Sequence, residues 1–180
     1  MPACEGGGLP VFSGDGSEPV MLIGQAPGRT EAVIGLPFAG DAGRRLAGWL
    51  GLAGVDPADF RMRWYVTSLG RCYPGRLPGA SADRSPARDE VERWSPYLLE
   101  ELRLVAPRLV VLVGGLAHRF AFGPDCRLDA VVGTERSWCG RATVCLPHPS
   151  GASTWLHAAE HQALWRNALG QIADHWARLR

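Results

Sequence analysis

The sequence contains no lysine, and this absence governs how its charge is interpreted. All 19 basic residues are arginines, and 18 acidic residues oppose them, so the formal net charge is only +1. The chain therefore lacks the overall basicity typical of proteins that bind nucleic acid through a broad positive surface. Seven arginines nonetheless gather in the middle third of the chain: Arg61, Arg63, Arg71, Arg76, Arg84, Arg88 and Arg93. This cluster is either a phosphate-binding surface, because arginine makes bidentate phosphate contacts, or a result of codon usage in a GC-rich genome.

Long apolar runs and paired cysteines are also absent. No stretch approaches the roughly 18 residues of a membrane-spanning helix, and the first residues lack the basic and apolar regions of a signal peptide. The five cysteines include no C-x-x-C pair. We therefore expect a cytoplasmic protein with reduced thiols and no membrane partner.

The length and composition of the chain are those of one soluble globular domain. Its 180 residues are 46% hydrophobic and 21% charged, which is enough to bury a substantial core. Residues 1–18 are rich in glycine, serine and proline, so we expect an irregular N-terminal arm followed by a single domain over residues 19–180.

Apolar periodicity predicts strands that alternate with helices. Buried strands are expected at residues 20–23, 61–67, 109–114 and 141–146. Helices are expected after an N-cap at Asp41, from about residue 87 to Pro107, and at 116–122. A long C-terminal helix carries an apolar face, formed by Trp165, Leu169, Ile172, Trp176 and Leu179. This alternation predicts an α/β fold: a single-domain, three-layer α/β/α architecture with a central four-stranded parallel sheet.

The most informative segment is the glycine- and proline-rich loop over residues 24–40, which follows the first predicted strand. Open α/β sheets bind ligands at the carboxyl ends of their strands, and Gly24, Gly28, Gly35 and Gly40 allow the backbone to approach a ligand closely. The loop is neither G-x-G-x-x-G nor G-x-x-x-x-G-K-[ST]. Its single amide, carboxylate and aromatic side chain favour a small pocket for a planar heterocycle over a polyphosphate site.

The same loop resembles the first motif of the uracil-DNA glycosylase superfamily. The family 4 pattern is G-E-A-P-G-x-x-E followed by G-R-P-F-x-G-x-A-G. Residues 24–31 are G-Q-A-P-G-R-T-E, and residues 35–43 are G-L-P-F-A-G-D-A-G. The main departure is Gln25, which replaces the first family 4 glutamate and matches the glutamine of the classical enzymes. The resemblance extends over roughly residues 19–176.

A second motif, H-P-S, stands at residues 148–150 after the last predicted strand. The resemblance implies that this loop presses on the DNA minor groove and that His148 stabilises the departing base. The alternative is a structural or solvated histidine. The wedge residue of the family would fall at Ala152, which is too small to replace a flipped base, so Trp155 or Leu156 is a candidate substitute.

A third resemblance covers residues 65–74, Y-V-T-S-L-G-R-C-Y-P, which are similar to the family 4 stretch Y-I-T-N-x-x-K-C-R-P-P. Family 4 enzymes recognise the polar edge of uracil with this asparagine. Ser68 takes its place here, with a hydroxyl that donates or accepts a hydrogen bond. The alternative is that Ser68 only ends a strand.

Family 4 members also bind an iron–sulfur cluster through four cysteines. Cys72 matches one ligand, Cys4 alone remains of the N-terminal pair, and Trp94 replaces another ligand. A four-iron cluster normally requires four thiolates, so we expect no cluster and no other cofactor. The remaining cysteines, Cys126, Cys139 and Cys145, are expected to be ordinary buried residues.

Residues 157–161, H-A-A-E-H, satisfy the H-x-x-E-H zinc motif. His157 and His161 would stand four residues apart on a helix, a spacing that suits a metal. A zinc enzyme needs a third ligand, and only 19 residues follow. We therefore expect these histidines on a solvated face with no metal bound, and keep a metallohydrolase as an alternative.

The resemblance implies a DNA repair glycosylase that flips a deaminated base, most simply uracil, out of DNA and hydrolyses its N-glycosidic bond. Gln25 would orient the water, Glu31 would act as base or electrostatic partner, and His148 would stabilise the leaving anion. The alternative is a catalytically inactive binder of damaged or single-stranded DNA. In either case we expect DNA as the partner and a monomer. The expected base-binding residues are Gly24, Ala26, Pro27, Gly28, Phe38, Ser68 and Ser150.

Overall fold

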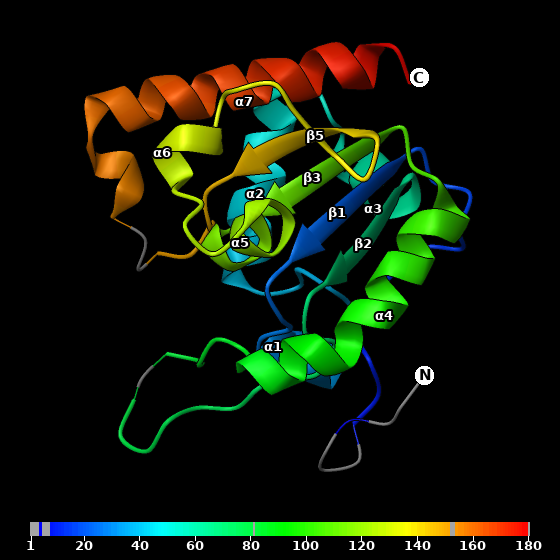
Figure 1. Cartoon of the computed structure of the whole chain (residues 1–180), viewed down its shortest axis with the longest axis vertical. Coiled ribbons are helices and arrows are strands. Elements are labelled where there is room, and N and C mark those ends of the chain that lie inside the picture. Colours follow the sequence, from blue (N-terminus) through cyan, green and yellow to red (C-terminus); the bar gives the residue numbers. More distant parts are fainter. Residues whose placement is uncertain (1–3, 5–7, 81, 152–153, 180) are drawn as a thin grey trace.

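The structure is a computed structural model of the whole chain, and it describes residues 4, 8–80, 82–151 and 154–179 (Figure 1). A single sheet with the strand order β2-β1-β3-β5-β4 forms its centre. The strands are β1 (Val20–Gly24), β2 (Trp64–Ser68), β3 (Leu109–Val113), β4 (Arg136–Trp138) and β5 (Arg141–Leu146). The first four strands in this order run parallel, and β4 pairs antiparallel with β5. Every residue of β1, β2 and β3 is buried, as expected for strands covered on both faces.

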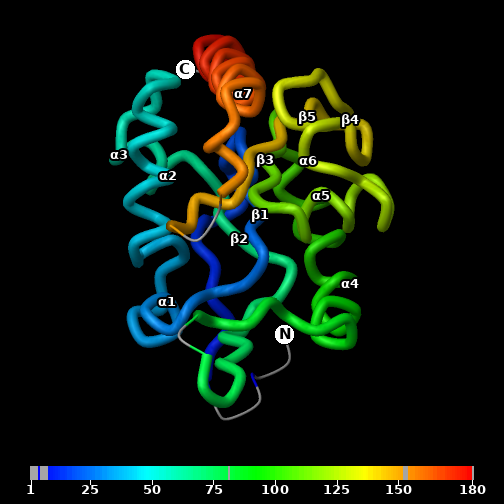
Figure 2. The backbone as a smooth tube through the Cα atoms, turned by 90° about the vertical axis from the view of Figure 1, so that its left-hand side faces the viewer, coloured from blue at the N-terminus to red at the C-terminus, as the bar shows by residue number. Residues whose placement is uncertain are grey.

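Helices cover both faces of the sheet (Figure 2). Between β1 and β2 come α1 (Arg29–Ile34), α2 (Asp41–Leu52) and α3 (Pro57–Met62). The helices α2 and α3 share one face with the C-terminal α7 (Ala159–Ala177), and α4 (Arg88–Val105), α5 (Gly115–Phe122) and α6 (Leu128–Val131) cover the other. A short 3₁₀ helix, Trp155–His157, precedes α7. This arrangement confirms the three-layer α/β/α prediction. None of the described helices is long and apolar enough to cross a bilayer.

The prediction of four strands is wrong by one, because it omits β4. This strand has three residues at the edge of the sheet, and Arg136 and Ser137 are exposed, so no buried pattern marks it. A two-residue turn joins it to β5, with positive φ at both Cys139 (50°) and Gly140 (72°). Such a turn is usually signalled by Asn-Gly or Asp-Gly, and Cys-Gly gave no such signal.

Two predicted boundaries are also wrong. The strand predicted at residues 61–67 begins only at Trp64, because Arg61 belongs to α3. Asp56 caps α3 by accepting a hydrogen bond from the backbone N–H of Ala58 at 2.8 Å, and a proline follows at the first helical position. Asp41 is the first residue of α2 rather than its N-cap, which is Gly40.

The N-terminal arm lies along the outer edge of β2. Ser13 pairs antiparallel with Val66, and the Val11 N–H donates to the Arg71 carbonyl at 2.9 Å. The Phe12 ring stacks on Tyr65, with 6.2 Å between the ring centroids. The arm therefore occupies an edge that would otherwise present unpaired backbone groups.

A disulfide joins this arm to the segment that follows β2. It links Cys4 to Cys72, whose Cα atoms lie 5.6 Å apart. The expectation of reduced thiols is therefore wrong for this pair. The expectation that the other three are buried holds for Cys145, whereas Cys126 is half-buried and Cys139 is exposed.

A buried ion pair lies next to this disulfide. Arg71 is fully buried and donates a hydrogen bond to the carboxylate of Glu101 on α4, which is itself buried. Burial raises the pKa of the neighbouring Tyr65 hydroxyl, and the negative charge of Glu101 adds to this effect. The arm thus covers a polar cluster that is buried beside the apolar core.

Candidate active site

A cavity of about 630 Å³ opens at the carboxyl ends of the parallel strands. Gly24 at the end of β1, Thr67 and Ser68 at the end of β2, and His148 and Ser150 after β5 line it, so it lies at the edge where open α/β sheets usually bind ligands. Its volume suits one small ligand. All ten residues that the sequence indicated line it: Gly24, Gln25, Ala26, Pro27, Gly28, Glu31, Phe38, Ser68, His148 and Ser150.

Gly114, directly after β3, leaves room for two of these side chains. A Cβ atom on Gly114 would lie 3.1 Å from Cδ2 of His148 and 3.3 Å from the side-chain amide of Gln25. The bare glycine, at φ 92°, therefore leaves room for both over the end of the sheet. Sequence reasoning placed Gly114 in a strand and missed this role, although a glycine that ends a buried strand is a usable signal.

His148 is held as a neutral hydrogen-bond donor. Its Nδ1 accepts a hydrogen bond from the Ser150 backbone N–H at 3.2 Å, so the proton of the neutral ring is assigned to Nε2. Burial lowers the pKa of His148 below its usual value, which favours the neutral ring. The Nε2–H group is thus available to stabilise negative charge on a ligand.

Glu31 holds the far end of the glycine-rich loop. It is the only buried residue of α1, and its Oε1 accepts a hydrogen bond from the Gly40 N–H at 2.8 Å. Its Oε2 lies only 2.7 Å from the place of a Cβ on Gly28. One carboxylate oxygen is therefore engaged with the loop, and the other faces the bare backbone of the cavity wall.

Phe38 and Ser68 approach the end of β1 from two directions. The Phe38 ring reaches across Gly24, where a Cβ atom would lie 3.1 Å from its Cζ. Ser68 pairs in register with the same Gly24 from the neighbouring strand. Its buried hydroxyl donates to the Gly70 carbonyl at 2.6 Å, so only its lone pairs remain for a ligand.

A hairpin whose described residues are 75–80 and 82–84 forms a cavity wall that sequence reasoning missed. Arg76 and Asp83 pair antiparallel across it, and the Arg84 N–H donates to the Gly75 carbonyl at 3.0 Å. The Asp83 carboxylate accepts hydrogen bonds from the Tyr73 hydroxyl and from Nε of Arg76, each at 2.8 Å. The segment has no hydrophobic period, so no sequence signal separates this hairpin from an irregular loop.

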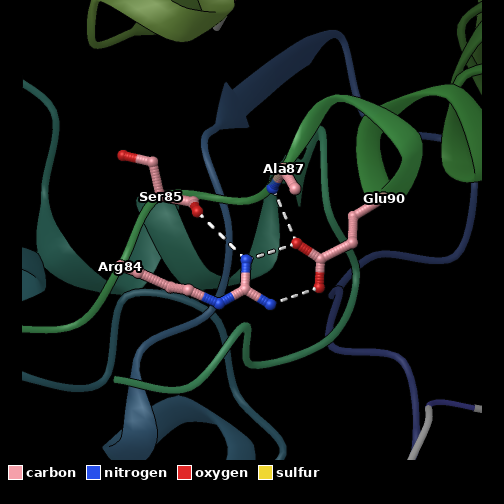
Figure 3. A network of polar contacts seen from close by, with 4 residues as sticks. All are labelled: Arg84, Ser85, Ala87 and Glu90. Carbon is pink, nitrogen blue, oxygen red and sulfur yellow. Dashed lines mark hydrogen bonds and ion pairs between the residues drawn. The ribbon is translucent and has the colours of Figure 1, made fainter. Parts of the chain in front are cut away.

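A polar network fixes the exit of this hairpin (Figure 3). The Arg84 guanidinium donates to both carboxylate oxygens of Glu90 on α4, at 2.6 and 2.8 Å. The same carboxylate accepts a hydrogen bond of 2.7 Å from the backbone N–H of Ala87, the N-cap of α4. Ser85 and Pro86, which line the cavity, are thereby tied to the start of α4.

The proposed wedge position, Ala152, lies outside the described residues. Of the two candidate substitutes, Trp155 stacks on His161 with 4.2 Å between centroids, and Leu156 is half-buried against the core. His157 is exposed in the 3₁₀ helix and His161 is half-buried in α7, so the expectation of two histidines on one solvated helix face is wrong. In the described part of the chain, no three His, Cys, Asp or Glu side chains gather as a metal site would require.

The cysteines do not fit an iron–sulfur cluster. Cys4 and Cys72 are bonded to each other, and the buried Trp94 stands at a third ligand position. A four-iron cluster normally needs four thiolates, and the disulfide removes the two that the sequence retains.

Comparisons with known proteins agree with this geometry. Residues 11–170 match the family model described as the uracil DNA glycosylase superfamily. The chain is 33% identical over 103 residues to a type-4 uracil-DNA glycosylase of Archaeoglobus fulgidus, which covers 57% of this chain and 47% of that protein. A protein of the same name from Pyrobaculum aerophilum is 35% identical over 95 residues, with 53% and 43% covered. Another from Thermotoga maritima is 28% identical over 134 residues, with 73% and 64% covered.

The matched segments span about half the length of the first two of these relatives. The family model, by contrast, covers most of this chain, including all three motifs that line the cavity. The chain therefore belongs to the uracil DNA glycosylase superfamily.

Proposed function

We propose that the protein is a monofunctional DNA glycosylase that flips a deaminated base, uracil first, out of DNA and hydrolyses its N-glycosidic bond. One observation carries this proposal: a single cavity collects an aromatic ring, a hydrogen-bond acceptor, a neutral histidine and a carboxylate. The activity after which the type-4 relatives are named supports the same assignment.

Phe38 and Ser68 would bind the base. Stacking on Phe38 would hold any planar base, because every base has a π face. Ser68, whose hydroxyl proton is engaged with Gly70, would accept a hydrogen bond from the ring N–H of uracil. Cytosine carries a lone pair at this ring position, so the same hydroxyl would disfavour it.

The catalytic residues would act on the two fragments of the broken bond. As the bond between C1′ and the base nitrogen breaks, its electron pair moves to the base and positive charge develops on the sugar. The Nε2–H of His148 would stabilise the base anion, and Gln25 would orient a water molecule towards C1′. Glu31 would stabilise the sugar cation and accept the proton of that water.

A second candidate is a catalytically inactive binder of damaged or single-stranded DNA. Gln25 favours it, because an amide cannot accept the proton that a glutamate at this position would take. Ser68 favours it as well, since it offers fewer hydrogen bonds to the base than an asparagine.

We further propose that the protein acts in the cytoplasm as a monomer, with residues 19–180 as the functional domain and residues 1–18 as an arm. Arg29 and Arg76 line the cavity, where they would contact the phosphates that flank the flipped nucleotide.

A lesion panel tests the proposal. Oligonucleotides with one uracil, hypoxanthine or xanthine, single-stranded and in each pairing, are incubated with the protein and cleaved at abasic sites with alkali. We expect strand scission that falls at least about 100-fold in Glu31→Gln and His148→Ala variants. Matched controls are Glu92→Gln and His157→Ala, both exposed and outside the cavity, which should keep full activity. If folded protein leaves every strand intact, the glycosylase activity is disproved. Slower migration in a gel of only the oligonucleotides that carry a lesion would then establish a DNA binder without catalytic activity.

A further inference from the structure

Phe38 adopts a backbone conformation that it would not hold alone. Its φ is 51°, in the left-handed region that a bulky residue rarely occupies. Such strain persists only where the surroundings fix it, and it concentrates at functional sites. The contacts that hold this turn therefore determine where the ring lies.

Arg61 is the main such contact. Its Nη1 donates to the Pro37 carbonyl at 2.7 Å and its Nη2 to the Phe38 carbonyl at 2.8 Å. The planar guanidinium thus bridges two successive carbonyls, which an ammonium group cannot match. Arg61 comes from α3, whose start is fixed by its aspartate N-cap and proline, and it is not among the residues that line the cavity.

The other sides of the turn are equally confined. A Cβ atom on Gly43 would lie only 1.8 Å from the Phe38 oxygen, so the turn packs directly on the bare backbone of α2. At the far end, Gly40 donates to Glu31. Burial lowers the pKa of Arg61 and the negative charge of Glu31 opposes that effect, so the two side chains also interact through charge. Residues 37–40 are therefore held between an arginine outside the cavity and a carboxylate inside it.

We propose that Arg61 is a positioning residue that fixes Phe38 as the stacking surface for the flipped base. It acts through Phe38 and does not touch the base. This assignment rests on the proposed function, because it requires a base to stack on the ring.

A double-mutant cycle tests the assignment. Free uracil is the probe, and its inhibition constant and direct binding are measured for wild type, Arg61→Lys, Phe38→Ala and the double variant. We expect Arg61→Lys to weaken uracil binding about tenfold, as loss of an ordered stacking surface would, and to change the single-turnover rate at saturating DNA much less. In the Phe38→Ala background the same substitution should have no further effect on uracil binding.

Arg63→Lys is the matched control. Arg63 follows the same helix, donates to the Leu179 carbonyl at 2.9 Å and lies over the Trp176 ring, away from the turn. The Arg63→Lys substitution should change thermal stability without changing uracil binding. Arg61→Gln is a second variant, without the charge, for the case in which the lysine variant does not fold. It should show the same coupling to Phe38.

Additive effects of Arg61 and Phe38, or unchanged uracil binding in both Arg61 variants, would overturn the assignment. If wild type neither binds uracil nor releases a base from DNA, the proposed function itself fails. The two failures are therefore distinguishable.

Discussion

Removal of the Cys4–Cys72 disulfide should destabilise the protein without unfolding it. The bond closes a loop with a sequence separation of 68 residues. In the chain-entropy model, a loop of this length restricts the unfolded state by about 4 kcal/mol at 25 °C. This is a large part of the roughly 5–15 kcal/mol that stabilises a typical domain. The native arm should stay docked, because the backbone pairing of Ser13 with Val66 does not depend on the bond.

Urea unfolding followed by tryptophan fluorescence measures this effect. Wild type is compared with and without reductant, and Cys4→Ser is measured under both conditions. The midpoint should fall on reduction, and Cys4→Ser should give the lower midpoint in either buffer. A thiol count on denatured, unreduced protein should give three free thiols. Five reactive thiols, or a wild-type midpoint that is the same with and without reductant, would refute the reasoning.

Two further predictions concern buried polar groups. Burial lowers the pKa of His118 from 6.5 to about 4, so the folded state binds fewer protons than the unfolded state below pH 6.5. Stability should be constant above about pH 7 and fall by up to about 3 kcal/mol as the pH drops from 6.5 towards 4. Urea midpoints across this pH range measure the loss. If a His118→Gln variant loses stability with falling pH as steeply as wild type does, His118 is not the cause. Glu101→Ala should cost about 3–5 kcal/mol, because it leaves the fully buried Arg71 without its ion-pair partner. Glu101→Gln should cost less, and a loss below 1 kcal/mol for the alanine variant by the same assay would show that the pair is not isolated from solvent.

The parts of the fold that followed from sequence are those with a strong local pattern. The short apolar runs at β1 and β3 predicted buried strands. The glycines at positions 24 and 28 predicted that a ligand approaches the backbone there, and both line the cavity. Because parallel strands end at one edge of a sheet, motifs that follow different strands and lie far apart in the chain meet at that edge.

The parts that failed depend on tertiary contacts. The helix α1 buries its glutamate, Glu31, whereas Val33 and Ile34 are 81% and 59% exposed, which reverses the usual amphipathic pattern. The pairing of Cys4 with Cys72 has no local signature, because the two residues meet only once the arm lies along β2. Arg61 was counted in a strand, and its role emerges only from the two carbonyls that it contacts.

The cavity has a floor of strand ends and a wall formed by the hairpin with described residues 75–80 and 82–84, and these two parts differ in how freely they can change. The floor is formed by strand ends whose residues also build the core, so substitutions there would disturb folding. The wall is a surface loop that is closed by its own pairing of Arg76 with Asp83 and fastened at its exit by Arg84. Loops of this kind tolerate insertion and replacement far better than core strands. Selectivity could thus diverge between relatives, or be redesigned by loop exchange, while the chemistry at the strand ends is inherited unchanged.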